Sequence, residues 1–362
     1  MSTRPLFEPF SLKSLHLSNR IVMAPMTRQK SPDSIPDAAV ARYYQQRAEG
    51  GVGLIITEGT TVDRPAASSN VAIPNFHDPR SLAGWRAVVN AVHAVGGKIA
   101  PQIWHQGIQR KPGTGPNPQA ASEGPSVFEK YKNQAMTDED IADTIEAFAS
   151  SAAHAKAIGF DAVELHGAHG YLIDQFLWEA TNQRADAYGG DHVGRTTFAA
   201  DVVRAVRARV GPDFVVILRF SQWKLNDYTA RLASNPQQLE SILAPLADAG
   251  IDIFHASTRR FWEPEFEGSN LNLAGWTKQL TGKPTITVGS VGLSGADFTG
   301  SMRGETAQVG DLVDLEKRLA EGEFDLVAVG RALISDPTWA KKIEQGRTDE
   351  LLPFEPSSMA QL

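Results

Sequence analysis

The fold and the candidate site are both decided by residues 160–177, which read FDAVELHGAHGYLIDQFL. The apolar positions at the start of this stretch predict a buried strand that leads directly into His166. Gly167 and Gly170 predict a sharp turn after the strand, because glycine tolerates backbone angles that other residues resist. The apolar run that follows Tyr171 predicts a short helix. The stretch is therefore interpreted as a strand, a glycine turn and a helix.

The turn carries three side chains that can do chemistry within six positions, namely His166, His169 and Tyr171. Two imidazoles offer hydrogen-bond donors and a phenol offers a proton, a combination typical of an active site at the end of a strand. The alternative is a pair of structural histidines beside a core tyrosine. Three such side chains on one glycine-flanked turn favour the active site.

The composition of the 362 residues indicates a mildly acidic protein without thiol chemistry. There are 35 Lys and Arg against 42 Asp and Glu, and the net charge of −7 argues against a nucleic-acid partner. The absence of cysteine excludes disulfides, thiolate metal sites, cysteine nucleophiles and iron–sulfur clusters. The first residues contain no apolar signal core, and no apolar run reaches about 18 residues. We therefore expect a soluble, cytoplasmic protein with no membrane partner.

Eight short apolar runs alternate with helical patterns along the chain. The runs predict strands at 20–25, 52–57, 98–103, 160–166, 215–220, 251–256, 285–289 and 326–331. Helices are predicted between and after them, at 37–49, 81–95, 137–158, 194–209, 236–249, 271–281, 311–321 and 336–345.

Strands that are continuously apolar belong to parallel sheets covered on both faces, so the architecture is α/β. Eight regular strand–helix units indicate a (β/α)8 TIM barrel and favour it over a doubly wound sheet. We expect a single domain over 1–362. A long loop at 106–136 follows the third strand, and an insertion at 292–312 follows the seventh.

Glycines and an arginine follow the last two predicted strands, where barrels often hold a phosphate. The seventh strand leads into Gly289-Ser290-Val291-Gly292, and the eighth leads into Gly330-Arg331. Glycine lets the backbone approach a phosphate closely, and arginine supplies a forked cationic donor. The two loops together indicate a phosphate pocket; the alternative is the ordinary chemistry of helix starts.

Three further residues at predicted strand ends suit a flavin, so we expect the phosphate to belong to FMN. Arg219 could place positive charge near the N1–O2 edge of the flavin, where negative charge collects on reduction. Gln102 offers a donor and an acceptor to the pyrimidine edge, and Thr27 can donate to O4. Each of the three has an alternative as a residue that caps the barrel mouth.

Several segments resemble the Old Yellow Enzyme family of flavin-dependent ene-reductases, and the resemblance covers nearly the whole chain. The most specific segment is HGAHGYL at 166–172. The others are LFEPF at 6–10, LSNRIVMAPMT at 17–27, YYQQRA at 43–48, GLIITEG at 53–59, and NQR at 182–184 through YGG at 188–190.

The resemblance implies roles for the residues at most of the predicted strand ends. FMN would be contacted by Pro25, Met26, Thr27, Gly59, Gln102, Arg219, Gly289, Gly330 and Arg331. His166 and His169 would hold the activating oxygen of the substrate, and Tyr171 would be the proton donor. Trp104, Phe261 and Trp262 are the candidates for the substrate side, although the last two could instead cover the barrel rim.

Three features depart from the family pattern. Thr27 stands where one branch carries cysteine, so tuning of the flavin by a thiol is absent. His166 pairs with His169, where many members pair histidine with asparagine. The insertion at 292–312 is longer than the pattern has between strands seven and eight.

The predicted function is that of an FMN-dependent ene-reductase, in which NADPH or NADH reduces the flavin. Hydride then passes to the C=C bond of an activated alkene such as an enone, enal, nitroalkene or maleimide. With an unperturbed pKa of about 10, Tyr171 stays protonated at neutral pH and can supply the proton. No G-x-G-x-x-G fingerprint follows a predicted strand, so the nicotinamide donor is expected to bind transiently. The oligomer is expected to be a monomer or a homodimer.

The alternative function is a metal-dependent barrel hydrolase with His166 and His169 as ligands and with His105 or His255 nearby. A catalytic zinc requires three protein ligands and a water, and this alternative leaves Gln102 and Arg331 without a role. We therefore expect no metal.

Overall fold

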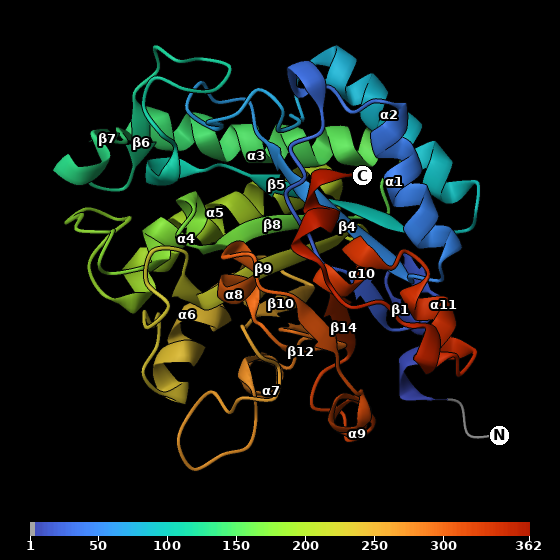
Figure 1. The fold of residues 1–362 in the computed structure, drawn as a ribbon. Coiled ribbons are helices and arrows are strands. Elements are labelled where there is room, and N and C mark those ends of the chain that lie inside the picture. The colour runs from blue at the N-terminus through green and yellow to red at the C-terminus, as the bar shows by residue number, and fades with distance from the viewer. Residues whose placement is uncertain (1–3) are drawn as a thin grey trace.

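Eight parallel strands pair side by side in chain order and close into a barrel in the computed structural model, which describes residues 4–362 (Figure 1). The barrel strands are β3 (Ile21–Met23), β4 (Leu54–Thr61), β5 (Ile99–Trp104), β8 (Ala162–His169), β9 (Val215–Lys224), β10 (Ile253–Ser257), β11 (Thr285–Val288) and β14 (Leu326–Val329). The last strand, β14, pairs with β3 and closes the ring. The predicted (β/α)8 barrel is thus confirmed. Residues 1–3 of the expected single domain lie outside the described part of the chain.

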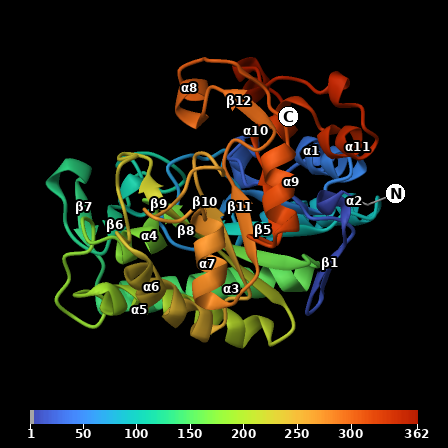
Figure 2. The ribbon, with the colours of Figure 1, turned by 90° about the horizontal axis from the view of Figure 1, so that it is seen from below.

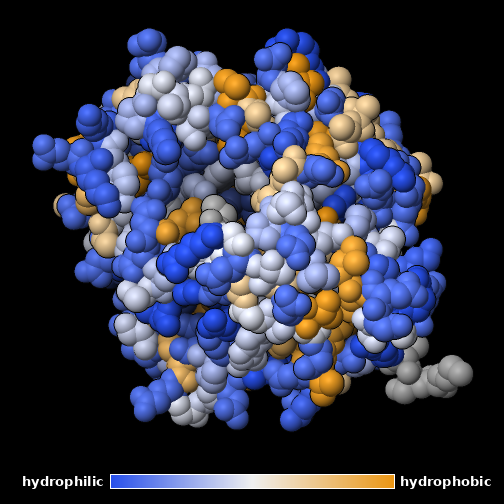
Figure 3. Space-filling model, viewed as in Figure 1, coloured by the Kyte–Doolittle hydropathy of each residue, from blue (hydrophilic) through white to orange (hydrophobic). Residues whose placement is uncertain are grey.

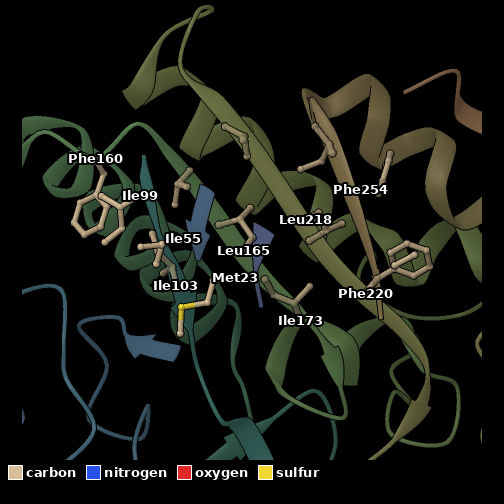
Figure 4. Packing of buried hydrophobic residues seen from close by; sticks show 14 of the residues in the cluster. Met23, Ile55, Ile99, Ile103, Phe160, Leu165, Ile173, Leu218, Phe220 and Phe254 are labelled. Carbon is tan, nitrogen blue, oxygen red and sulfur yellow. The ribbon is translucent and has the colours of Figure 1, made fainter. Parts of the chain in front are cut away.

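The barrel strands are continuously apolar because alternate residues point to two different buried regions. The inward side chains form one cluster that includes Val22, Leu54 and Ile217. The outward ones, such as Ile55 and Leu218, pack against the surrounding helices (Figure 4). Both faces of the sheet are therefore buried, as a parallel barrel requires.

Helices surround the barrel and can be followed from two directions in Figures 1 and 2. They are α1 (Ala38–Glu49), α2 (Pro79–His93), α3 (Asp138–Ile158), α4 (Leu172–Leu177), α5 (His192–Val210), α6 (Pro236–Ala249), α7 (Leu273–Thr281), α8 (Phe298–Met302), α9 (Val313–Ala320), α10 (Arg331–Ser335) and α11 (Trp339–Glu344). The capping box predicted at Thr137 opens α3. Its hydroxyl accepts from the Asp140 N–H at 3.1 Å, and the Asp140 carboxylate accepts from the Thr137 N–H at 2.9 Å. Within residues 4–362 no helix is long and apolar enough to cross a membrane.

A hairpin that the sequence analysis did not predict covers one end of the barrel. Its strands are β1 (Phe10–Leu12) and β2 (Leu15–Leu17), and its turn uses Lys13 at φ 51°. Leu15 and Leu17 join the inward cluster. Ser14 N donates to the carbonyl of Asp213, just before β9. The hairpin therefore covers the end where the strands begin, which leaves the opposite end for a site.

Three barrel strands run three or four residues further than predicted. β4 continues through Gly59 to Thr61, β9 continues to Lys224, and β8 continues through Gly167 to His169. The predicted turn at Gly167 is therefore wrong. A Cβ at Gly167 would lie 3.1 Å from the Arg219 carbonyl oxygen, so this glycine permits close strand packing. The turn falls at His169 and Gly170, whose φ angles are 64° and 83°.

The two long connections both contain ordered structure. The loop at 106–136 includes the two-stranded sheet of β6 (Ser122–Gly124) and β7 (Asn133–Ala135). The insertion at 292–312 folds as β12 (Leu293–Gly295), α8 and β13 (Ala307–Val309), with the two strands antiparallel. The positions of both connections agree with the prediction.

The last residues of the chain return to the loop after β3, and Figure 1 shows the C-terminus near the labels of β4 and β5. Arg28, only 4% exposed, donates from Nη2 to the backbone carbonyls of Ser358 at 3.4 Å, Met359 at 3.4 Å and Gln361. Ser335 Oγ lies 3.2 Å from Ser358 Oγ. The C-terminal segment is thus attached beside the proposed cofactor residues that precede Arg28.

Candidate active site

Four aromatic side chains meet where β5 and β8 end. The ring centroids of His166 and His169 lie 5.3 Å apart, and those of His166 and Tyr171 lie 4.9 Å apart. Trp104 stacks on His166 at 5.9 Å and meets the edge of Tyr171 at 4.7 Å. The face of the molecule drawn in Figure 3 is hollowed near its centre, where Figure 1 labels β5 and β8. The structure thus brings together the three residues predicted to be catalytic and one predicted substrate residue.

His166 is held as a neutral ring with a defined tautomer. The backbone N–H of Ala168 donates to Nδ1 at 3.3 Å, so the proton of the neutral ring lies on Nε2. Burial, and then the positive charge of Arg219, lowers the pKa of His166 well below its usual value. At neutral pH His166 therefore offers a single Nε2–H donor.

His169 is oriented by two serines that the sequence analysis did not single out. Its backbone N–H donates to Ser221 Oγ at 2.9 Å, and its Nε2 lies 2.8 Å from Ser257 Oγ. Arg219 Nη2 donates to the same Ser257 hydroxyl at 3.2 Å. Burial, and then the charge of Arg219, also lowers the pKa of His169 well below its usual value. Ser257 thus links a predicted catalytic histidine to a predicted cofactor residue.

Tyr171 is a half-buried phenol that stays protonated at neutral pH. Burial raises its pKa to about 12. Its backbone N–H donates to the carbonyl of Ala168, and its carbonyl accepts from the Gln175 N–H at the start of α4. The turn through Gly170 therefore fixes the ring beside the two histidines.

A buried polar chain that the sequence analysis missed lies beside the histidines, inside the barrel. Gln102 Nε2 donates to Glu164 Oε1 at 2.8 Å, and Glu164 Oε2 lies 2.6 Å from His255 Nδ1. Glu164 and His255 are both 0% exposed. One donor of Gln102, expected to face a flavin, is thus committed to Glu164.

Arg219 gives the clearest indication that the site could hold a cofactor. It is 7% exposed, and its Nε is buried with no hydrogen-bond partner in the described part of the chain. Burial lowers its pKa to about 10, so it still carries positive charge at neutral pH. A buried cationic donor without a partner is costly, and it fits the electron-rich edge of a flavin.

The residues after β3 lie close to the end of β14 and to β4. The Met26 sulfur is 3.6 Å from the point where a Cβ of Gly330 would lie, so Met26 and Gly330 are neighbours. Arg28 N, which follows Thr27, donates to Glu58 Oε2 at 2.8 Å. Pro25 is half-buried and Thr27 is exposed. A Cβ at Gly59 would come within 2.5 Å of the Trp104 ring, so only glycine fits there.

The predicted phosphate loops also lie together, but both Nη atoms of Arg331 already make hydrogen bonds within the chain. Its Nη1 donates to the carbonyls of Ala296 at 2.8 Å and Asp297 at 2.9 Å, both in the insertion. Its Nη2 faces Ser290 Oγ at 3.3 Å. Gly289 has φ 154°, and a Cβ there would lie 2.7 Å from Thr258 Oγ1. Close backbone approach is thus required here, while Arg331 mainly holds the insertion.

Phe261 and Trp262 contact residues that flank the insertion in the sequence, Gly289 before it and Arg318 after it. Their ring centroids are 5.1 Å apart, Phe261 N donates to the Gly289 carbonyl, and the Trp262 carbonyl accepts from Arg318. Phe261 is 5% exposed and Trp262 is 38% exposed. These contacts join them to the rim and not to the histidine pair.

A zinc site finds no support in the geometry. The residues that the structure describes contain no group of three or more His, Asp or Glu side chains that could hold a metal ion. His105 Nε2 lies 3.0 Å from Glu123 Oε1, and its Nδ1 accepts from the Gly107 N–H. His255 is bound to Glu164.

Known proteins resemble the chain along most of its length. The sequence model of the NADH:flavin oxidoreductase / NADH oxidase family matches residues 5–350. The NADH oxidase of Thermoanaerobacter brockii is 36% identical over 96% of this chain, which spans 52% of that longer protein. The flavin oxidoreductase hxnT of Emericella nidulans is 32% identical, with 94% of this chain and 91% of that protein covered.

A solved structure shares the fold. Morphinone reductase in complex with tetrahydroNAD superposes with a TM-score of 0.82 at 30% identity, covering 98% of this chain and 93% of that one.

Proposed function

Since the chain belongs to the NADH:flavin oxidoreductase / NADH oxidase family, which includes Old Yellow Enzyme, we propose that it is an FMN-dependent NAD(P)H oxidoreductase that reduces activated alkenes. The single observation that carries the proposal is the group of His166, His169 and Tyr171 beside Arg219, a buried cation whose Nε has no hydrogen-bond partner in the described part of the chain. The proposed active unit is one domain over 1–362.

The two histidines bind and polarise the substrate oxygen. His166 offers its Nε2–H, and His169 lies at right angles to it with centroids 5.3 Å apart. A carbonyl or nitro oxygen placed between them gains negative charge as hydride arrives at the alkene, and the donors stabilise that charge. Because both rings are neutral, they act as hydrogen-bond donors and do not protonate the oxygen.

Tyr171 supplies the proton at the other alkene carbon. Its raised pKa, about 12, keeps the phenol protonated across the physiological range. Its ring meets His166 edge-on at 4.9 Å, so the proton donor lies next to the oxygen-binding group. Trp104 packs against both rings and fixes their positions relative to each other.

The cofactor that fits the remaining residues is FMN. The chemistry that it supplies when bound is hydride transfer, first from reduced nicotinamide and then to the alkene. Arg219 would face its N1–O2 edge, Gln102 its pyrimidine edge and Thr27 its O4, with Pro25, Met26 and Gly59 beside the ring. Gly289, Ser290, Gly330 and Arg331 would hold the phosphate. NADPH or NADH would be the transient hydride donor.

The test begins with the purified protein. We expect a yellow solution that releases FMN, and not FAD, on acid or heat treatment. We also expect that oxidation of NADPH or NADH is coupled to saturation of the C=C bond of cyclohexenone. Chromatography of the product measures this reaction. A colourless protein that cannot be reconstituted with FMN and oxidises neither donor would contradict the proposal.

A further inference from the structure

A cavity of about 450 Å³ lies beside the candidate site. It is bordered by the loop after β10 and by the insertion at 292–312. The side chains that define its character are Tyr228, Arg259, Arg260, Asp297, Arg303 and Glu305, which we call the arginine pocket. None of these residues has a role in the reaction proposed above.

A row of flat side chains connects the arginine pocket to the histidine pair. The His169 ring lies 4.4 Å from Trp223, and Trp223 stacks on Tyr228 at 5.4 Å with an interplanar angle of 17°. The Arg259 guanidinium then covers Tyr228 at 4.7 Å. The pocket is also close in sequence to the site, because Arg259 follows Ser257 by two positions. A long, flat ligand bound at His169 can therefore reach the arginines.

The arginine pocket carries more positive than negative charge, with three arginines against Asp297 and Glu305. Asp297 pairs with Arg259 and lies 3.8 Å from Arg260, whose Nη1 is also 3.0 Å from Glu263. Arg259 Nε is buried and finds no hydrogen-bond acceptor within residues 4–362. In a chain with a net charge of −7, three arginines around one cavity indicate an anionic ligand.

We infer that the arginine pocket binds a phosphate group of the reduced nicotinamide dinucleotide, an inference that rests on the proposed function. The nicotinamide ring has to lie near the histidine pair to deliver hydride, and the rest of the dinucleotide extends away from it. Phosphate is the anion that the forked donors of arginine match best. The pyrophosphate, common to NADH and NADPH, and the 2′-phosphate, present only in NADPH, are the two sources of that group.

The test compares two double variants as FMN-loaded enzymes. Arg260→Ala/Arg303→Ala removes two cations from the pocket and leaves Arg259, which holds the insertion through Asp297. Arg204→Ala/Arg209→Ala removes two cations from the outer face of α5, where they pair with Asp201 and Glu146. The first variant should raise KM for the nicotinamide donor about tenfold, as expected for a lost charge-assisted contact, with kcat and FMN content unchanged. The control should leave all three unchanged.

Comparing KM for NADH with KM for NADPH identifies which phosphate of the dinucleotide the arginine pocket binds. A KM rise for NADPH alone supports the 2′-phosphate, and calorimetry should then show that 2′,5′-ADP binds the parent and not the pocket variant. An equal rise for NADH and NADPH supports the pyrophosphate, and 5′-ADP should then lose affinity in the same way.

Other results would overturn the inference. An active parent with an unchanged KM for both donors in the pocket variant contradicts the inference alone. Loss of FMN from that variant would assign the pocket to the flavin phosphate instead. A parent that oxidises neither donor would contradict the proposed function and the inference with it.

Discussion

At the scale of single residues, Tyr171 has a proposed role in only half of the catalytic cycle, so replacing it should separate the two halves. Tyr171→Phe keeps the ring that packs on Trp104 and His166 and removes only the hydroxyl. Flavin reduction by NADPH or NADH needs no proton from this residue and should run at nearly the parent rate. Reoxidation by cyclohexenone should slow by about 10²-fold or more, because the carbon next to the carbonyl loses its proton donor.

Stopped-flow absorbance measures both steps, and reoxidation by a quinone serves as the control. A quinone takes its protons at oxygen from water, so that step should be largely spared. If the Phe variant reduces cyclohexenone as fast as the parent, Tyr171 is a packing residue and the proton has another source.

Glu58 is a second residue with a measurable consequence, this time for stability. It is 1% exposed, its Oε2 accepts from Arg28 N and Gln29 N, and its Oε1 has no partner within the described residues. Burial raises the pKa of Glu58 from 4.5 to about 7. Between these values the folded chain holds a proton that the unfolded chain has lost, so this group makes stability fall as pH rises through that interval.

Glu58→Gln should remove that dependence, because the amide resembles the protonated acid and its oxygen can still accept from Arg28 N. Near pH 4.5 the free energies of unfolding of parent and variant should be similar. Near pH 8 the variant should be more stable, by roughly 1–3 kcal/mol. Chemical denaturation at both pH values measures the difference, with the exposed Glu49→Gln as the control. A difference that does not change with pH would show that Glu58 ionises normally.

At the scale of elements, the insertion formed by β12, α8 and β13 is held in part by one side chain from the start of α10, Arg331. Arg331 donates to two insertion carbonyls and to Ser301, while Ala307 pairs with Phe354 on the other side. Arg331→Ala removes a donor from each of the two carbonyls, although the Asp297 carbonyl keeps the Ser301 N–H. Amide hydrogen exchange across 293–309 should therefore become faster, and the protein should retain less FMN if the phosphate lies where we propose.

Mass spectrometry of the exchanged peptides measures this effect, and peptides from α3 provide the internal control. Arg331→Lys should give an intermediate result, since it keeps the charge but loses the fork. Unchanged exchange in the Ala variant would mean that the strand pair β12–β13 and the Ala307–Phe354 bridge hold the insertion by themselves.

At the scale of the whole molecule, the barrel could be predicted because its signals are local. Each strand is apolar on both faces, and helix starts such as Thr137 carry their capping partner three residues later. The hairpin β1–β2 also carries a local signal in the sequence. Phe10, Leu12, Leu15 and Leu17 alternate with polar residues around a two-residue turn.

The rest of the site depends on contacts that sequence spacing does not reveal. Glu164 and His255 bind each other from positions 91 residues apart, and Ser257 reaches His169 across 88 residues. Gly167 is a further case in which the sequence alone does not reveal the role of a residue. A turn and a close packing contact require the same residue type, and only the neighbouring Arg219 carbonyl distinguishes them.

The attachment of the C-terminal segment to Arg28 has a practical consequence for handling the protein. The carbonyls of Ser358, Met359 and Gln361 converge on a side chain that directly follows Thr27. A purification tag or fluorescent fusion added after Leu362 would leave from beside this contact and pull on the loop that carries the proposed flavin residues. Arg4, near the other end of the chain, contacts Glu316 and the Ile343 carbonyl, so a fusion at that end would leave from a different part of the molecule.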